Sequence, residues 1–252
     1  MQVISHGQAA ELPVANVFHL SDRLAGRDVS ITPKDAGGLR CFERDEEIFG
    51  EGDPADFLFE VVSGAVRTYK LLSDGRRQID AFHIPGDIFG IESGREYRFS
   101  AEAIQEVTVR TIRRRSLDTL VRSDSDLPSR LVAAMARSLE RAQDHMLLLG
   151  RKSAREKIAS FLLGLADRIN GEKTLELPMS RADMADHLGL TIETVSRTVT
   201  QLQREKLIDL PSSRRVIILR NVAALRQLDA GDSETPARLN RHEGRRLSVA
   251  AY

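Results

Sequence analysis

The segment that decides the fold is residues 180–206, SRADMADHLGLTIETVSRTVTQLQREK. It begins with Ser180, a helix-capping residue, and Asp183 follows three positions later, at the spacing of a capping box. Gly189 follows the apolar residues of this first helix, where a sharp turn needs a positive φ. Thr191 can then cap a second helix. The segment therefore predicts two helices joined by a tight turn.

The second helix of this pair is expected to be amphipathic. Val195, Val199 and Leu202 are spaced four and three residues apart and should face the core. The opposite face then presents Glu193, Ser196, Arg197, Thr200 and Arg204. In a helix-turn-helix, the N-terminal part of this face enters the major groove of DNA. We therefore expect base contacts from Glu193, Ser196 and Arg197, because arginine can bind guanine and glutamate can accept from cytosine.

Two apolar segments, 207–210 and 216–219, follow the helix pair and flank a turn that holds Arg214 and Arg215. Two strands with a basic turn predict a winged module whose arginines contact phosphate. The expected DNA backbone contacts are Ser180, Thr191, Thr198, Thr200, Arg204, Arg214 and Arg215. A small helical hairpin with solvated charges is the competing interpretation. The caps, the glycine and the buried valines fall together at the required offsets, which favours DNA binding.

A long apolar stripe lies upstream of the helix-turn-helix. Its residues recur in steps of four and three at Leu127, Leu131, Met135, Leu139, Ala142, Met146 and Leu149. Such a stripe either packs on its own domain or pairs with a second copy of the helix. We expect a homodimer, with Leu131, Met135, Leu139, Ala142, Met146 and Leu149 at the interface.

Residues 41–115 have a different pattern, of short strand-like runs separated by turn residues. Runs at 57–62 and 65–72 precede an Asp74-Gly75 hairpin signal, and further runs lie at 78–84 and 101–112. Several short strands at this spacing predict a sandwich or jelly roll.

Composition restricts the remaining possibilities. The net charge is zero, with acids crowded into 43–60 and bases into 197–220, which points to a basic C-terminal module. The single cysteine, Cys41, excludes an internal disulfide and a four-thiolate metal site. Since no signal-peptide pattern or membrane-spanning run is present, a cytoplasmic protein without a membrane partner is expected. We find no nucleophile elbow, phosphate loop or ligand-spaced cluster, so no enzymatic activity and no metal are expected.

The order of these parts resembles the Crp/Fnr family over residues 40–220. The matching motifs are Glu51-Gly52-Asp53, Val62-Ser63-Gly64-Ala65-Val66, Pro85-Gly86-Asp87-Ile88-Phe89-Gly90 and Glu193-Thr194-Val195-Ser196-Arg197. The last motif is similar to the Fnr and FixK subgroup; the cyclic-AMP receptor subgroup has arginine where Ile192 stands. The resemblance implies a site like TTGA, a short spacer and TCAA, activation of genes for low-oxygen respiration or nitrogen metabolism, and a contact with RNA polymerase, for which the 73–76 hairpin is a candidate.

The chain also differs from the family that it resembles at the positions that would hold a ligand. Cyclic-nucleotide binders carry a Gly-Glu-Leu turn and an Arg-Ser pair, whereas this chain has Gly90-Ile91-Glu92 and Tyr97-Arg98-Phe99-Ser100. The N-terminal cysteine cluster that holds an iron–sulfur cube in Fnr is missing. We therefore expect no cofactor and no obligatory effector. The alternative is a regulator gated by a cyclic nucleotide, gripped by Arg95 or Arg98, or by haem, for which His83 and Cys41 are the candidates.

The expected fold is α+β and has five parts. A flexible arm covers 1–30, a cyclic-nucleotide-binding-type β jelly roll covers 31–122, and a dimerisation helix covers 123–151. A winged helix-turn-helix covers 152–228, and a mobile tail covers 229–252. The expected partners are double-stranded DNA, a second copy of the chain and RNA polymerase.

Overall fold

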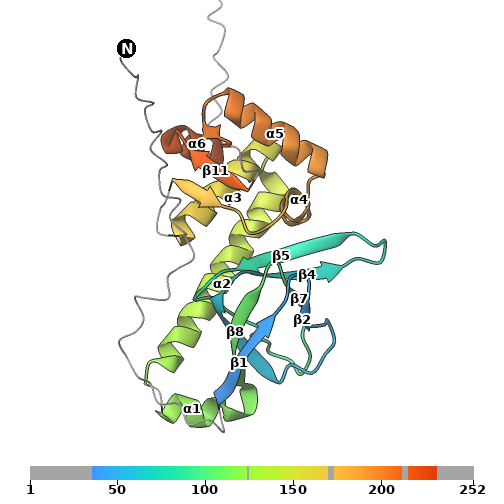
Figure 1. Cartoon of the computed structure of the whole chain (residues 1–252), viewed down its shortest axis with the longest axis vertical. Helices are drawn as coiled ribbons and strands as arrows, with labels where there is room; N and C mark the ends of the chain where they lie inside the picture. Colours follow the sequence, from blue (N-terminus) through green and yellow to red (C-terminus); the bar gives the residue numbers. More distant parts are fainter. Residues whose placement is uncertain (1–35, 124, 170–172, 212–214, 232–252) are drawn as a thin grey trace, which may run out of the picture.

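The computed structural model describes residues 36–123, 125–169, 173–211 and 215–231. The expected arm (1–30) and the expected tail from residue 232 onward lie outside the described residues. A β-rich domain occupies one end of the molecule and a mostly helical domain the other, and the long helix α2 runs between them (Figure 1). The expected α+β class and the expected order of domains are confirmed.

The N-terminal domain consists of two antiparallel four-stranded sheets. Their strand orders are β1-β8-β3-β6 and β2-β7-β4-β5. The strands are β1 (Ala36–Phe42), β2 (Glu47–Phe49), β3 (Phe57–Ser63), β4 (Val66–Leu71), β5 (Arg77–His83), β6 (Ile88–Phe89), β7 (Ser100–Ala103) and β8 (Val107–Arg113). The segment 101–112, expected as one strand, is divided between β7 and β8. The reason is that the chain crosses at 104–106 from the sheet in which β7 pairs with β4 to the sheet in which β8 pairs with β3.

Stacked aromatic rings fill part of the space between these sheets. The rings of Phe49 and Tyr97 have centroids 3.7 Å apart, and those of Phe59 and Phe89 lie 5.2 Å apart. His83 stacks on Phe89 at 4.9 Å and is only 6% exposed. Such offset ring pairs add to the free energy gained by burying apolar area. These rings give the barrel a packed aromatic core.

The connection to the C-terminal domain is helical. A short turn, η2 (Arg114–Ser116), leads into α1 (Leu117–Ser123) and then into α2 (Leu127–Arg151), a helix of 25 residues. Pro128 stands in the first turn of α2, where its missing N–H costs nothing. Two of these elements, η2 and α1, were not expected from the sequence.

The apolar stripe of α2 is mostly exposed within one chain. Met135 is 50% exposed, Leu139 61%, Met146 67% and Leu149 37%, and Ala142 is exposed as well. Leu131 differs from them, because it is partly buried against Leu58, Ile112, Leu120 and Leu127 of its own domain. Two exposed apolar residues were missing from the expected interface, Val132 at 66% and Leu147 at 57%.

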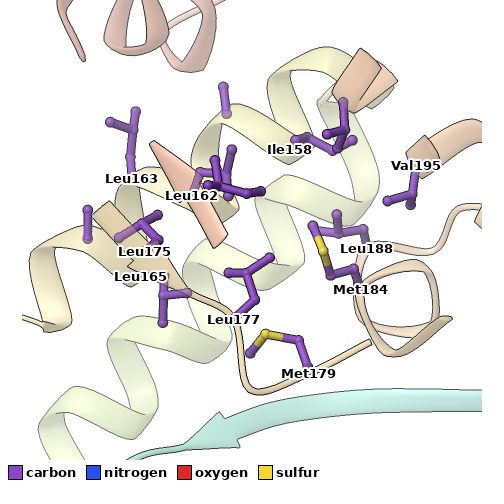
Figure 2. Packing of buried hydrophobic residues seen from close by; sticks show 14 of the residues in the cluster. Ile158, Leu162, Leu163, Leu165, Leu175, Leu177, Met179, Met184, Leu188 and Val195 are labelled. Atoms are coloured by element: carbon purple, nitrogen blue, oxygen red, sulfur yellow. The ribbon is translucent and has the colours of Figure 1, made fainter. Parts of the chain in front are cut away.

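In its described residues, the C-terminal domain combines four helices with a three-stranded sheet of order β10-β11-β9. Its elements are α3 (Ala154–Arg168), β9 (Thr174–Glu176), α4 (Arg181–Leu188), α5 (Ile192–Arg204), β10 (Ile208–Asp209), β11 (Val216–Leu219) and α6 (Val222–Asp229). Neither β9 nor α6 was expected, and α6 runs one residue into the segment expected to be a mobile tail. Leucine, isoleucine and methionine side chains from α3, β9 and α4 form the core (Figure 2).

The two domains share one apolar cluster. Ile79 and Phe82 of β5 belong to the same buried cluster as Met184 and Leu188 of α4. Phe82 also meets Phe161 of α3 edge to face, with ring centroids 6.0 Å apart. The hairpin of β4 and β5 accordingly lies against α4 (Figure 1). The helix-turn-helix is thus seated on the barrel as well as on its own core.

Candidate nucleic-acid interface

Local signals position the first helix of the pair, α4. The hydroxyl of Ser180 accepts from the backbone N–H of Asp183 at 3.1 Å, and the Asp183 carboxylate accepts from the Ser180 N–H at 3.0 Å. This reciprocal pair is the predicted capping box. Gly189 ends the helix in the left-handed conformation, with φ 60° and ψ 44°. The predicted turn is confirmed, and the chain leaves it directly into α5.

The second helix, α5, buries one side completely. Val195 and Leu202 are 0% exposed and Val199 is 2% exposed, so the predicted apolar face forms the contact with the rest of the domain. Thr191 caps the helix by accepting from the Thr194 N–H at 3.2 Å. Burying three apolar side chains on one face fixes which residues point outward. That outward face is the candidate interface.

Glu193, Ser196 and Arg197 are all exposed on the outward face of α5. They occupy positions i, i+3 and i+4 and therefore lie on neighbouring turns of the same side. Within the described part of the chain, the side chains of Glu193 and Arg197 make no hydrogen bond or ion pair, so both are available to a ligand. Ile192, 44% exposed, precedes them at the start of the helix. The structure brings together the residues expected to contact bases.

The residues expected to contact the DNA backbone divide into several groups. Arg204 and Arg215 are exposed, whereas Arg214 lies outside the described residues. Ser180, Thr191 and Thr200 are exposed, but their hydroxyls already take part in bonds within the chain. The expectation for Thr198 is wrong, because this residue is only 6% exposed. It lies on the apolar side of α5, three residues after Val195, and faces the core.

His187 lies in the last turn of α4, a position where histidine usually interacts with the helix dipole or with solvent. Instead its ring stacks on that of His145 of α2, with centroids 4.2 Å apart. The backbone oxygen of Ile79 can only accept, so His187 Nδ1 carries the proton and donates to it at 3.1 Å. Burial, reinforced by the electrostatic influence of the neighbouring His145, lowers the pKa of His187 to about 3. The ring is therefore a neutral part of the junction between barrel, α2 and α4.

Two further residues hold the helix-turn-helix and were missed by the sequence analysis. Lys157 of α3 is 8% exposed and donates from Nζ to the backbone oxygen of Leu188 at 3.0 Å. His145 donates from Nε2 to the backbone oxygen of His187 at 2.7 Å. Both groups satisfy carbonyls that a helix end leaves without partners. A signal for Lys157 existed, because it lies four residues before Phe161, in the apolar stripe of α3.

The residues considered for an effector or haem lie in different places. Arg95 and Arg98 line an open depression of about 380 Å³ together with Glu51 and Lys70, which are paired at 2.8 Å. Burial lowers the pKa of His83, inside the barrel, to about 3. Cys41, the other haem candidate, is exposed on β1, with its sulfur 3.6 Å from Thr108 Oγ1.

Two larger features are absent from the described residues. No group of three or more His, Cys, Asp or Glu residues suited to a metal ion occurs among them. No helix in the described part of the chain has the length and apolarity needed to cross a membrane.

Comparison with known proteins agrees with this geometry. Residues 39–124 match the cyclic nucleotide-binding domain, and residues 156–228 match the Crp-like helix-turn-helix domain. Among similar proteins, the nitrogen fixation regulation protein FixK of Azorhizobium caulinodans is 53% identical over 77% of this chain and 80% of its own length. The FixK protein of Rhizobium meliloti is 46% identical over 75% of this chain and 86% of its own length. The solved structure of FixK2 from Bradyrhizobium japonicum is 49% identical and covers 77% of this chain and 97% of that one, with a TM-score of 0.71.

A barrel of this kind followed by a helix-turn-helix defines a class of DNA-binding transcription regulators, and the chain belongs to that class, the Crp/Fnr family. Within the family it is of the FixK type, as the sequence of α5 predicted.

Proposed function

We propose that this protein is a homodimeric activator that binds an inverted repeat in double-stranded DNA through α5. The observation that carries the proposal is that Glu193, Ser196 and Arg197 are exposed to solvent on a helix whose other side is buried. Arg197 would donate two hydrogen bonds to guanine, and Glu193 would accept from cytosine. Ser196 is short enough to let the helix backbone approach the base edges. The expected site resembles TTGA, a short spacer and TCAA.

A second copy of α2 is the partner we propose for the exposed stripe. Leu139 and Met146 are more than half exposed in the single chain, which is costly for large apolar side chains unless something covers them. Pairing the two α2 helices across a two-fold axis would bury the apolar stripe of each. It would also place the two recognition helices on one side of the dimer. Two half-sites about one helical turn apart suit such a dimer.

The proposed input is the amount of protein and not a bound effector. The stacked rings of Phe49, Tyr97, Phe59 and Phe89 occupy the barrel interior and so support a domain that is folded without a ligand. Control would then act through synthesis or proteolysis. The alternative is an effector-gated switch that uses a cyclic nucleotide or haem, and no described residue favours it over the proposal.

The proposed pathway follows from the relatives. Two of them are named nitrogen fixation regulation proteins, so activation of nitrogen-metabolism or low-oxygen respiration genes is proposed for this chain. RNA polymerase is the proposed second partner, and the candidate contact is the β4–β5 turn. Arg76, 77% exposed, pairs there with Asp74 at 2.8 Å. The protein would act in the cytoplasm, by binding and without catalysis.

Equilibrium binding of the purified full chain tests the proposal. Anisotropy is measured with a TTGA–spacer–TCAA duplex and with a scrambled duplex of the same composition, at fixed salt. The proposal expects a preference of about 10³-fold or more, without added ligand. Equal affinity for the two duplexes would contradict it. A preference that arises only after adding a cyclic nucleotide or haem would establish the alternative.

A further inference from the structure

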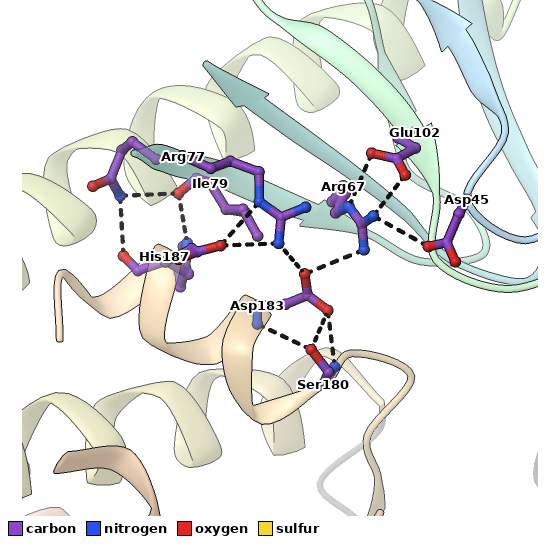
Figure 3. Close-up of polar contacts among 10 residues, drawn as sticks. Asp45, Arg67, Arg77, Ile79, Glu102, Ser180, Asp183 and His187 are labelled. Atoms are coloured by element: carbon purple, nitrogen blue, oxygen red, sulfur yellow. Dashed lines mark hydrogen bonds and ion pairs between the residues drawn. The ribbon is translucent and has the colours of Figure 1, made fainter. Parts of the chain in front are cut away.

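Two arginines of the barrel converge on one carboxylate of the helix-turn-helix (Figure 3). Arg67 of β4 donates from Nη1 to Asp183 Oδ1 at 3.2 Å, and Arg77 of β5 donates from Nη2 to the same oxygen at 2.7 Å. Arg77 Nε also donates to Asp186 Oδ2 at 2.9 Å, nearly one turn further along α4. We call these four residues, Arg67, Arg77, Asp183 and Asp186, the barrel–α4 clamp.

The centre of the clamp is buried. Arg67 is 7% exposed and Asp183 is 3% exposed. Burial disfavours the charge on Arg67, but the carboxylates of Asp183, Glu102 and Asp45 more than offset this and raise its pKa. Glu102 accepts from Arg67 at 2.7 Å and Asp45 at 3.2 Å. A buried charge held by three carboxylates requires a fixed geometry, because the loss of one partner leaves a charge uncompensated.

Asp183 connects this charge network to the helix-turn-helix itself. Its Oδ2 caps α4 by accepting from the Ser180 N–H, while its Oδ1 accepts from both arginines. The other end of α4 is also tied to the barrel, because Gln78 Nε2 donates to the His187 oxygen at 3.3 Å. Both ends of α4 are thus hydrogen-bonded to the hairpin of β4 and β5. Since α4 and α5 share a core, the direction of α5 follows from that of α4.

We propose that the barrel–α4 clamp sets the angle at which each recognition helix leaves the dimer, and thereby the half-site spacing that the protein accepts. Arg67 and Arg77 are positioning residues in this proposal, which rests on the proposed function as a dimer on an inverted repeat. We call the clamp closed when its ion pairs are formed, as they are here. In this state α4 lies between β5 and α5 (Figure 1), and the proposed base-contacting face of α5 is exposed. The closed clamp is therefore the DNA-binding form, and it needs no ligand to form.

Spacing selectivity in the full-length protein tests the clamp. The variants are Arg77→Gln and Asp186→Asn, both at the less buried edge of the clamp, and Arg67→Gln at its centre. Dissociation constants are measured for the preferred inverted repeat, for the same half-sites moved one base pair further apart, and for a single half-site. A released helix-turn-helix can adapt to both spacings. We expect the preference between the two repeats to fall by about fivefold or more, the range of ordinary coupling between sites.

The remaining readouts separate positioning from folding. Single half-site affinity and the thermal unfolding midpoint should stay close to wild type in Arg77→Gln and Asp186→Asn, whatever happens to the more buried Arg67→Gln. The double variant of Arg77 and Asp186 should lose no more selectivity than Arg77→Gln alone, because Arg77→Gln already removes the contact with Asp186. The matched control is Arg76→Gln, one residue away and paired within its own turn, which should keep wild-type selectivity.

Several outcomes would overturn the proposal. Unchanged spacing preference in folded Arg77→Gln and Asp186→Asn would do so, as would an equal loss in the Arg76→Gln control. Tighter binding of the preferred repeat by the clamp variants would mean that the contact is inhibitory. If the wild-type chain shows no preference for an inverted repeat at all, the proposed function fails, and that result is distinct from failure of the clamp.

Discussion

Replacing Gly189 by alanine is a direct test of how the helix-turn-helix corner is built. Gly189 has φ +60°, and a Cβ placed on it would lie 3.1 Å from Leu149 Cδ2 and 4.0 Å from Lys157 Nζ. The left-handed conformation costs a non-glycine residue about 1–2 kcal/mol. The close contact adds little, because the Leu149 methyl is the far end of a flexible, partly exposed side chain. We therefore expect Gly189→Ala to lower the free energy of unfolding by about 1–2 kcal/mol.

Urea unfolding of the full chain at one fixed protein concentration measures this loss, because dimerisation would make the apparent stability depend on concentration. Two variants serve as controls. Gly189→Asn should lose less stability, since asparagine tolerates the left-handed region better than alanine. Gly164→Ala should gain about 0.5–1 kcal/mol, because Gly164 lies within α3 and its added Cβ would meet nothing within 4 Å. A Gly189→Ala protein as stable as wild type would refute the reasoning.

Four further predictions concern DNA binding, assembly and pH. Arg197→Ala should weaken binding to the specific duplex by about 1–3 kcal/mol and relax the preference for one base per half-site, as measured by anisotropy on single-base variants. Arg215→Ala should weaken binding to all duplexes alike and reduce the slope of log K against log salt by about one, as a salt titration would show. Leu139→Asp should shift the protein toward monomer in sedimentation, since it places a charge in the proposed interface; an unchanged dimer would exclude that interface. His83 and His187 have pKa values lowered from 6.5 to about 3, so the unfolded chain binds more protons between these values and stability should fall as pH is lowered through that window. The loss is at most about 1.4 kcal/mol per pH unit for each histidine, and unfolding that is independent of pH between 4 and 6, a window of about two units, would contradict it.

The helix-turn-helix could be predicted because its signals are local. The cap at Ser180, its partner Asp183 and the glycine at 189 stand within ten residues of one another, and each acts on its own backbone. The burial of Thr198 could have been predicted from the same local signals. Thr198 lies three residues after Val195 and four before Leu202, so the apolar period already placed it on the buried side of α5.

The junction between the domains could not be predicted in this way. Arg67 and Asp183 are 116 residues apart in the chain, and no periodicity connects a strand residue with a helix cap at that distance. The burial of His187 could not be predicted for the same reason, since it comes from Phe82, Phe161 and His145, which belong to three other elements. The strand β9 has three residues, too few for an alternating pattern to stand out.

Selection of bound duplexes from a random library by the purified chain tests the central claim most directly. The account predicts a two-fold symmetric motif with half-sites resembling TTGA and TCAA. With the Arg197→Ala variant, the selected motif should lose its preference for one base in each half-site. Recovery of no motif, or of an asymmetric motif that Arg197→Ala leaves unchanged, would show that α5 does not read the DNA.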